Sequence, residues 1–288
     1  MTPTTAMRLG RVSNLPTVWT NVLAGIAMAG VTPWQWATLP AAAGVSLAYL
    51  GGMYLNDAFD RGIDARERPS RPIPSGAVSA NTVFAAGFAL LLGAVAVLLA
   101  AAHGFGEPPE AAVLAMLALG AAVVTYNWHH KDNPLSPLAM GACRLLAYLA
   151  AGLAAAAALT GPLLGAAMVS LCYLLGLTYA AKGERPGAAR RVWPLLFLAA
   201  PLAYGIMLAD SAAGWAVLLL LAVWTGAAVW LLRRRRPGDV GRAVVALIAG
   251  IALLDALFLT VAGWPGAALL ALGCFCATLV LQRWISGT

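Results

Sequence analysis

Charged residues and long polar stretches are scarce in this sequence. Aspartate, glutamate, lysine and arginine together supply 10% of its 288 residues, whereas hydrophobic residues supply 61%. Apolar runs of about twenty residues recur from Leu15 to the end of the chain, which is the length needed to cross roughly 30 Å of hydrocarbon. These values exclude an ordinary soluble enzyme and leave no stretch for a soluble domain. The sequence therefore predicts a polytopic all-α membrane protein with one domain over residues 1–288.

Cysteine is scarce as well, and its spacing speaks against a cysteine-based metal site. The four cysteines fall within apolar segments and form no CxxC pair: Cys143, Cys172, Cys274 and Cys276. We interpret them as small core residues. The net charge of +7 would suggest a nucleic-acid partner in a soluble protein. In a membrane protein the placement of charge matters more than its sum, and we expect no nucleic-acid partner.

Hydrophobic runs predict a bundle of ten transmembrane helices. The segments cover approximately residues 15–31, 35–58, 80–103, 110–128, 137–159, 162–181, 192–209, 213–232, 241–262 and 266–284. Basic residues gather in alternate connections, whereas the other connections are short and rich in glycine and proline. The polar loops are residues 59–79, 128–137, 182–192 and 233–242. The positive-inside rule then predicts that both termini and these loops face the cytoplasm.

Acidic side chains concentrate directly behind the second apolar segment. Residues four apart lie on one face of a helix, so Asn56, Asp60 and Asp64 form a column if the helix continues about one turn past residue 59. Asp57 stands beside this column. Oxygen ligands without histidine or cysteine favour Mg²⁺ or Ca²⁺ over Zn²⁺, and Mg²⁺ is usually completed by substrate phosphates. This face therefore predicts a metal site that binds a phosphorylated molecule.

Arginines close to the column could bind the phosphates of such a ligand. They are Arg61, Arg66, Arg68 and Arg71. The alternative is a solvated loop whose acids merely pair with its arginines. An ordered column at the end of a transmembrane helix argues against that alternative, because charges near hydrocarbon are costly unless they have a function.

The same segment carries a resemblance to a known family. The string Asn56-Asp57-x-x-Asp60-x-x-x-Asp64, followed by Arg68-Pro-Ser-Arg71-Pro-Ile-Pro-Ser-Gly76, resembles the first aspartate-rich signature of the UbiA superfamily of intramembrane prenyltransferases. The resemblance implies nine helices around a cavity that opens to the bilayer and the cytoplasmic side. It also implies that Mg²⁺ held by the acids binds an isoprenoid diphosphate, whose prenyl group passes to an aromatic or other lipophilic acceptor. On this basis we expect Asp60, Asp64 and Lys182 to be catalytic.

The second aspartate-rich motif of the family is depleted in this chain. The corresponding stretch, residues 179–191, contains one carboxylate, Glu184, among several bases. We expect Glu184, Lys182 and Arg185 to contact the substrate, and whether a second metal site exists stays open. A Lys-Gly-Glu loop of this kind resembles a divergent, EboC-like branch of the superfamily.

Further candidate substrate contacts lie around the third polar loop and in the first helix. Tyr126, Lys131 and Arg144 match the family's central-loop pattern, and Asn21 and Tyr179 are polar groups in apolar segments. For Lys131 the alternative is an anchor on the cytoplasmic side, and for Arg144 a side chain that snorkels to the interface. We expect His129 and His130 to face water and headgroups. We expect Asp255 to form a hydrogen bond between helices.

An allylic cation needs a dry cavity with aromatic faces. The aromatic candidates are Phe59, Tyr49, Trp128, Tyr148, Tyr173 and Tyr179. Three other functions stay open: a terpene cyclase of the same architecture, a transporter or lipid carrier, and a binding protein without catalysis. A CDP-alcohol phosphotransferase requires an Asp-Gly-x-x-Ala-Arg run, which the segment from Asp60 to Arg66 only partly imitates.

Overall fold

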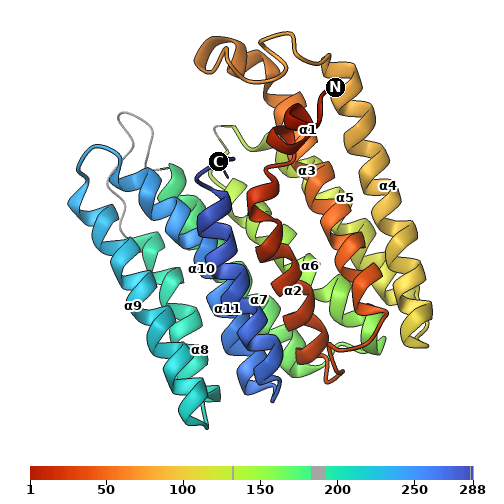
Figure 1. The fold of residues 1–288 in the computed structure, drawn as a ribbon, viewed down its shortest axis with the longest axis vertical. Helices are drawn as coiled ribbons and strands as arrows, with labels where there is room; N and C mark the ends of the chain where they lie inside the picture. The colour runs from red at the N-terminus through yellow and green to blue at the C-terminus, as the bar shows by residue number, and fades with distance from the viewer. Residues whose placement is uncertain (132, 183–192, 286, 288) are drawn as a thin grey trace.

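The computed structural model describes residues 1–131, 133–182, 193–285 and 287, and the regular secondary structure of these residues is entirely helical (Figure 1). The α-helices are α1 (Pro3–Leu9), α2 (Leu15–Met28), α3 (Thr38–Glu67), α4 (Ala80–Phe105), α5 (Glu110–His129), α6 (Ser136–Ala156), α7 (Gly161–Lys182), α8 (Ala200–Leu208), α9 (Ala212–Arg234), α10 (Asp239–Val261) and α11 (Pro265–Leu281). Two short 3₁₀ helices accompany them, η1 (Val12–Asn14) and η2 (Trp193–Ala199).

Seven of these helices are long and apolar enough to cross a membrane, namely α3, α4, α5, α6, α7, α9 and α10. Each of the ten predicted segments contains helix, so the prediction of an all-α membrane bundle is confirmed. Three predicted segments are shorter or broken, however. One is α11, which ends at Leu281 instead of residue 284. Helix α2 ends at Met28 before Gly30, which has a φ of +87°. The segment predicted at 192–209 contains η2 and α8, because Pro201 in the first turn of α8 cannot donate a hydrogen bond to the preceding turn.

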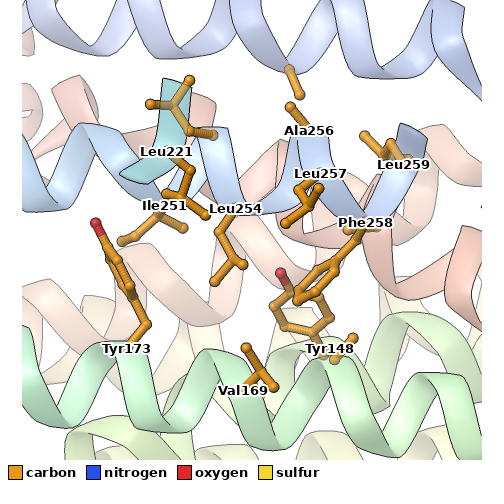
Figure 2. Packing of buried hydrophobic residues seen from close by; sticks show 14 of the residues in the cluster. Tyr148, Val169, Tyr173, Leu221, Ile251, Leu254, Ala256, Leu257, Phe258 and Leu259 are labelled. Atoms are coloured by element: carbon orange, nitrogen blue, oxygen red, sulfur yellow. The ribbon is translucent and has the colours of Figure 1, made fainter. Parts of the chain in front are cut away.

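Helix α2 lies between two halves of the bundle. It packs against α3 and α6 on one side and against α10 and α11 on the other. Its side chains divide between two hydrophobic clusters: Val18 and Val22 belong to the cluster built mainly by α3 to α6, and Leu23 belongs to the cluster around α10. Figure 2 shows the second cluster, in which Tyr148 and Phe258 meet edge to face with ring centroids 6.2 Å apart.

A close approach of α2 and α6 fixes the position of the polar residues that these helices carry. A Cβ atom added at Gly25 would lie 2.8 Å from the carbonyl oxygen of Tyr148, and one added at Gly152 would lie 2.9 Å from the carbonyl oxygen of Gly25. Small residues at such contacts let helix backbones pack closely in membranes.

The polar connections gather at one end of the bundle. Figure 1 shows the N-terminus, the loop after α3, the turn between α9 and α10 and the C-terminus at that end. This arrangement agrees with the alternation of basic loops in the sequence.

Candidate functional site

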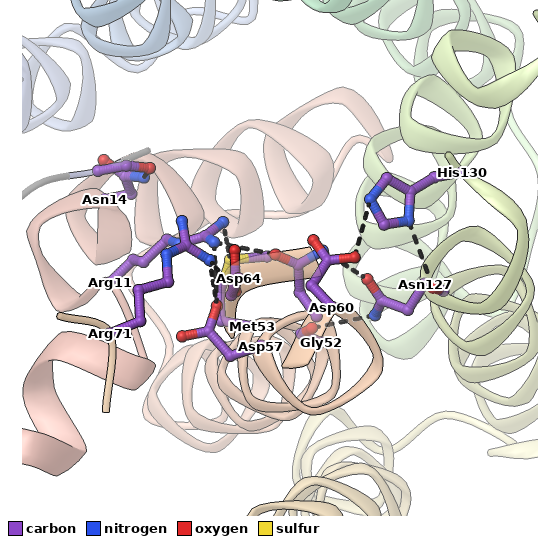
Figure 3. Close-up of polar contacts among 12 residues, drawn as sticks. Arg11, Asn14, Gly52, Met53, Asp57, Asp60, Asp64, Arg71, Asn127 and His130 are labelled. Atoms are coloured by element: carbon purple, nitrogen blue, oxygen red, sulfur yellow. Dashed lines mark hydrogen bonds and ion pairs between the residues drawn. The ribbon is translucent and has the colours of Figure 1, made fainter. Parts of the chain in front are cut away.

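Helix α3 continues through the charged segment and ends at Glu67, two residues before Pro69. The predicted column is thus helical, and its four side chains are only 4–8% exposed: Asn56, Asp57, Asp60 and Asp64. A carboxylate in such surroundings is stable only when it is paired and hydrogen-bonded. We call these four side chains the acidic row, or the row. Figure 3 shows that basic side chains from three other parts of the chain contact it.

Two arginines hold the left part of the row in Figure 3. Arg71 Nη1 lies 3.1 Å from Asp57 Oδ1 and 3.0 Å from Asp64 Oδ2, so one guanidinium bridges two carboxylates. Arg11 Nη2 lies 3.2 Å from the same oxygen of Asp57 and donates to Asn56 Oδ1 at 2.9 Å. Arg71, one of the four arginines predicted to bind phosphate, thus pairs with the acids, and its role toward phosphate stays a prediction.

Asp60, the remaining carboxylate of the row, faces the loop that follows α5. Lys131 Nζ lies 3.1 Å from Asp60 Oδ2, and His130 Nε2 lies 3.5 Å from Asp60 Oδ1. The His130 ring also stacks on Tyr126, with centroids 4.9 Å apart. The expectation that His130 faces water was therefore wrong, because stacking on the side chain four residues earlier turns the ring inward. His129 is exposed, as predicted.

Asparagine side chains join the row to the interior. Asn56 Nδ2 donates to Asn127 Oδ1 at 3.1 Å, and Asn127 Nδ2 donates to the carbonyl oxygen of Gly52 at 3.0 Å. Both amides are thereby fixed in orientation. Within the described ranges, no three acidic, histidine or cysteine side chains enclose a point where a metal ion could sit. The predicted ligands share one helix face and do not form a complete metal cage.

Arg11 was not predicted as a site residue. Its backbone adopts the left-handed conformation, with φ 43° and ψ 50°, between α1 and η1. A residue other than glycine is uncommon in this region and costs of order 1 kcal/mol or more. Tyr49 Oη donates to the Arg11 carbonyl oxygen at 3.2 Å and fixes this turn. A partly buried tyrosine and two partners in the row, Asn56 and Asp57, thus hold the strained residue against α3.

Other predicted bases lie away from the row. Arg61 Nη1 donates to the carbonyl oxygen of Ala58, and its guanidinium lies 5.5 Å from the centre of the Phe84 ring. The Arg68 side chain is exposed. Neither side chain is brought to the carboxylates by the observed helix.

The end of α7 approaches the loop between α5 and α6. Lys182 Nζ donates to the carbonyl oxygen of Asn133 at 2.8 Å, and Tyr179 Oη donates to that of Pro134 at 3.4 Å. Glu184 and Arg185 lie outside the described residues, together with the rest of 183–192. The predictions for the second motif stay predictions.

A cavity adjoins the row on its inner side. It has a volume of about 130 Å³ and is lined by α2, α3, α5, α6 and α7. Most lining side chains are aliphatic, and the polar ones include Asn21, Tyr49, Tyr126, Asn127 and Arg144. The prediction that Asn21 lines a cavity is confirmed.

Of the six predicted aromatic faces, Tyr49 lines this cavity. Phe59 packs edge to face on Phe84, Trp128 is 72% exposed, and the hydroxyls of Tyr148 and Tyr173 donate to Asp255 and to the carbonyl oxygen of Leu247. These rings serve packing and helix contacts in the described bundle.

Deeper in the bundle, Arg144 and Asp255 belong to one hydrogen-bonded group. Arg144 Nη1 donates to the carbonyl oxygen of Thr17 at 3.3 Å and to Asn21 Oδ1. Asp255 accepts from Thr20, Asn21 and Tyr148. The predicted interhelical hydrogen bond of Asp255 is confirmed, and Arg144 points into the cavity instead of snorkelling to the interface.

Together these features suit an amphiphile with an anionic head. Buried oxygen ligands and cationic side chains stand beside a largely aliphatic cavity, and Asn127, which lines this cavity, accepts a hydrogen bond from Asn56 of the row. A divalent cation and a phosphate group would bind at the row, while a hydrocarbon tail would occupy the aliphatic cavity.

Known proteins share this sequence pattern. A sequence profile of the UbiA prenyltransferase family matches residues 15–248. Digeranylgeranylglyceryl phosphate synthase from Methanopyrus kandleri is 32% identical over 195 residues, which cover 67% of this chain and 58% of that protein. Chloroplastic chlorophyll synthase from Avena sativa is 34% identical over 118 residues, which cover 38% of this chain and 30% of that protein. The chain thus spans less than two thirds of the length of either relative.

Solved structures share the fold. A UbiA homolog from Archaeoglobus fulgidus, solved bound to DMAPP and Mg²⁺, has a TM-score of 0.61 with this chain at 16% sequence identity. The match covers 90% of this chain and 99% of that one. A structure described for digeranylgeranylglyceryl phosphate synthase in membranes has a TM-score of 0.65 at 17% identity, covering 90% of this chain and 98% of that one.

Proposed function

This chain belongs to the UbiA prenyltransferase family, and from that premise we propose that it transfers a prenyl group from an isoprenoid diphosphate to a lipophilic or aromatic acceptor within the membrane. The observation that carries the proposal is the row of buried carboxylates with paired cations next to an apolar cavity. A headgroup with several negative charges and a greasy tail matches both parts.

The donor set of the row fits Mg²⁺. All four side chains offer oxygen atoms, which is the chemistry that a hard divalent cation prefers. They line one helix face, so Asn56, Asp57, Asp60 and Asp64 would supply part of the coordination, with diphosphate and water oxygens completing it. Bound there, Mg²⁺ would neutralise charge that develops on the leaving diphosphate.

Basic side chains around the row would bind the diphosphate directly. Arg11, Arg71 and Lys131 already lie 3.0–3.2 Å from carboxylate oxygens, so small side-chain movements would transfer their N–H groups to phosphate oxygens. We assign Asp60, Asp64 and Lys182 to catalysis. The two acids hold the headgroup through the cation, and Lys182 neutralises the diphosphate as it leaves. Tyr126, Tyr179, Glu184 and Arg185 complete the proposed contacts.

The proposed reaction breaks one bond of the donor and forms one to the acceptor. The C1–O bond of the allylic diphosphate breaks and its electron pair leaves with the diphosphate. The acceptor atom then donates an electron pair to C1 and loses a proton, which the departing diphosphate can accept. A cavity with mainly aliphatic walls keeps water away from the allylic cation during this step.

We propose that residues 1–288 act as one domain with the site on the cytoplasmic side. The support is the concentration of basic residues in the loops at the end of the bundle that carries the row. Both termini would lie on that side.

Diphosphate release by the purified protein tests the proposal. Protein in detergent would be incubated with labelled geranyl, farnesyl and geranylgeranyl diphosphates, a lipid-soluble acceptor extract, and either Mg²⁺ or a chelator. We expect Mg²⁺-dependent release with a prenylated product, and its loss in Asp60→Ala. Asp210→Asn, which removes an exposed carboxylate between α8 and α9, is the matched control and should keep activity.

Other results would identify the alternatives. Equal release by wild type and Asp60→Ala would reject the proposal. A cyclic hydrocarbon formed without acceptor would indicate a terpene cyclase, and Mg²⁺-dependent donor binding without any product would indicate a carrier.

A further inference from the structure

A single guanidinium stands in the wall of the cavity. Arg144 is the one charged side chain among the residues that line it in the described part of the chain. It lies eight residues into α6 from Ser136, about 12 Å of helix rise. An ionisable residue at such a place in a membrane protein is costly and calls for a function.

No carboxylate of the acidic row pairs with Arg144 among the described residues. Tyr49, which lines the cavity near Arg144, precedes Asp57 by eight residues of α3, again about 12 Å of rise. The row also has its own cations, and Arg144 takes part in none of the ion pairs formed there by described residues. A donor headgroup held at the row therefore leaves Arg144 for another ligand.

Arg144 keeps donor capacity toward the cavity. Its Nη1 donates to Thr17 and Asn21, and its Nη2 lies 3.5 Å from Thr17 Oγ1, at the limit of a hydrogen bond. A guanidinium has five N–H donors. Within residues 1–131, 133–182, 193–285 and 287, its Nε has no hydrogen-bond partner and no carboxylate lies within ion-pair distance of it.

Asp255 stands behind this guanidinium without touching it. Its side chain is fully buried and accepts from Thr20, Tyr148 and Asn21. Because Asn21 Nδ2 points to Asp255 at 3.3 Å, Asn21 Oδ1 points to Arg144. Asp255 thus fixes the amide that fixes the guanidinium, and it lies outside the cavity lining.

The charge of Arg144 affects the proposed reaction. An allylic cation that forms in the same low-dielectric cavity is repelled by a guanidinium without a direct counter-ion. An anionic group bound to Arg144 removes this repulsion and places a negative charge near the developing cation. The acceptor is the reactant that can bring such a group, since the donor's anionic end lies at the row.

We propose that the Asp255–Asn21–Arg144 chain presents Arg144 to the acceptor, and that the acceptor carries a carboxylate or phosphate which Arg144 binds. This inference rests on the proposed prenyl transfer. Arg144 is the recognition residue, and Asp255 is a positioning residue that acts through Asn21.

Binding of matched acceptor pairs tests the inference. One pair is an aromatic carboxylate and its amide, and the other is an alkylglycerol phosphate and the corresponding alkylglycerol. Binding of each compound would be measured on detergent-purified protein loaded with Mg²⁺ and a non-hydrolysable thiolodiphosphate analogue of the donor. We expect at least a tenfold preference for the anionic member of one pair, and which pair shows it distinguishes the two anions.

Variants then test whether the hydrogen-bonded residues Asp255, Asn21 and Arg144 cause the preference for an anionic acceptor. Arg144→Met should abolish it while donor-analogue binding changes less than threefold, and Arg144→Lys should retain part of it. Asp255→Asn should reduce the preference severalfold. Tyr173→Phe, which removes a buried hydroxyl outside the cavity, should leave it unchanged.

The outcomes separate this inference from the proposed function. Equal binding of anionic and neutral acceptors by the wild type, or an unchanged preference in Arg144→Met or in a folded Arg144→Gln, would overturn it. If the Asp255→Asn variant kept the full preference of the wild type for the anionic acceptor, Asp255 would have no positioning role. Failure of the wild type to bind the donor analogue at all would instead count against prenyl transfer.

Discussion

Replacing Arg71 by methionine should destabilise the protein through the acids that it bridges. Arg71 lies 3.1 Å from Asp57 and 3.0 Å from Asp64, and the three side chains are 16%, 8% and 5% exposed. After the change Asp57 keeps Arg11, but Asp64 loses the one cationic partner that the described residues give it. Removing one member of a buried ion pair costs about 3–5 kcal/mol. Since Arg71 is partly exposed, we expect about 3 kcal/mol, or roughly a hundredfold in the folding equilibrium.

A double-mutant cycle isolates the pair. Asp64→Asn removes the charge that Arg71→Met leaves uncompensated, so the double variant should be more stable than Arg71→Met alone. We expect a coupling energy of about 1–2 kcal/mol, within the range for contacting residues. Unfolding would be followed by tryptophan fluorescence during titration of detergent micelles with dodecyl sulfate, in metal-free buffer. Arg68→Met, which removes an exposed arginine, should cost less than about 0.5 kcal/mol. Purely additive losses, or equal stability of the Arg68 and Arg71 variants, would refute the reasoning.

Three other changes have defined outcomes. Gly25→Ala should lower the free energy of unfolding by about 1–3 kcal/mol in the same assay, because its Cβ would lie 2.8 Å from a backbone oxygen of α6. The control Gly120→Ala, whose Cβ would meet open space, should not destabilise the protein. Similar losses for both variants would contradict this. Lys131→Met should raise the donor dissociation constant roughly tenfold or more, measured by titration calorimetry, through loss of a charged hydrogen bond; unchanged affinity would place the headgroup elsewhere. Ala147→Trp should narrow the cavity and reduce turnover of the longest donor before the shortest; a uniform loss in a folded variant would argue against a tail-binding cavity.

The acidic row could be predicted from sequence because it depends on local geometry. Asn56, Asp60 and Asp64 share a face as long as the helix continues, and the first proline that stops it is Pro69. The membrane interpretation rested on composition in the same way. The prediction that all four cysteines are core residues was wrong for Cys276, which is exposed, whereas Cys274 is buried. Where helical spacing alone determines the outcome, the structure agrees.

Residues brought to the row by tertiary structure were harder to predict. Arg11 precedes an apolar run, which is the usual signal of a membrane-side anchor, and its partner Asn56 is 45 residues away. Nothing in the local pattern indicates that its backbone turns left-handed at this point. His130 had a usable signal, because Tyr126 four residues earlier on the helix could stack on it.

The interior polar group shows a different limit. Asn21, Arg144 and Asp255 were each identified as polar residues in apolar segments, and Asp255 was expected to bond to a neighbouring helix. Sequence could not show that all three belong to one group. That depends on α2 packing against both α6 and α10, a contact made by residues more than a hundred positions apart.

The pairing of each aspartate on α3 with an arginine, lysine or histidine has a consequence for the protein in the cell. A chain whose acids are neutralised by its own bases can complete insertion and folding before any divalent ion reaches it. A lack of magnesium would then inactivate such a protein without leading to its degradation by quality-control proteases. Adding the ion would restore its activity without new protein synthesis.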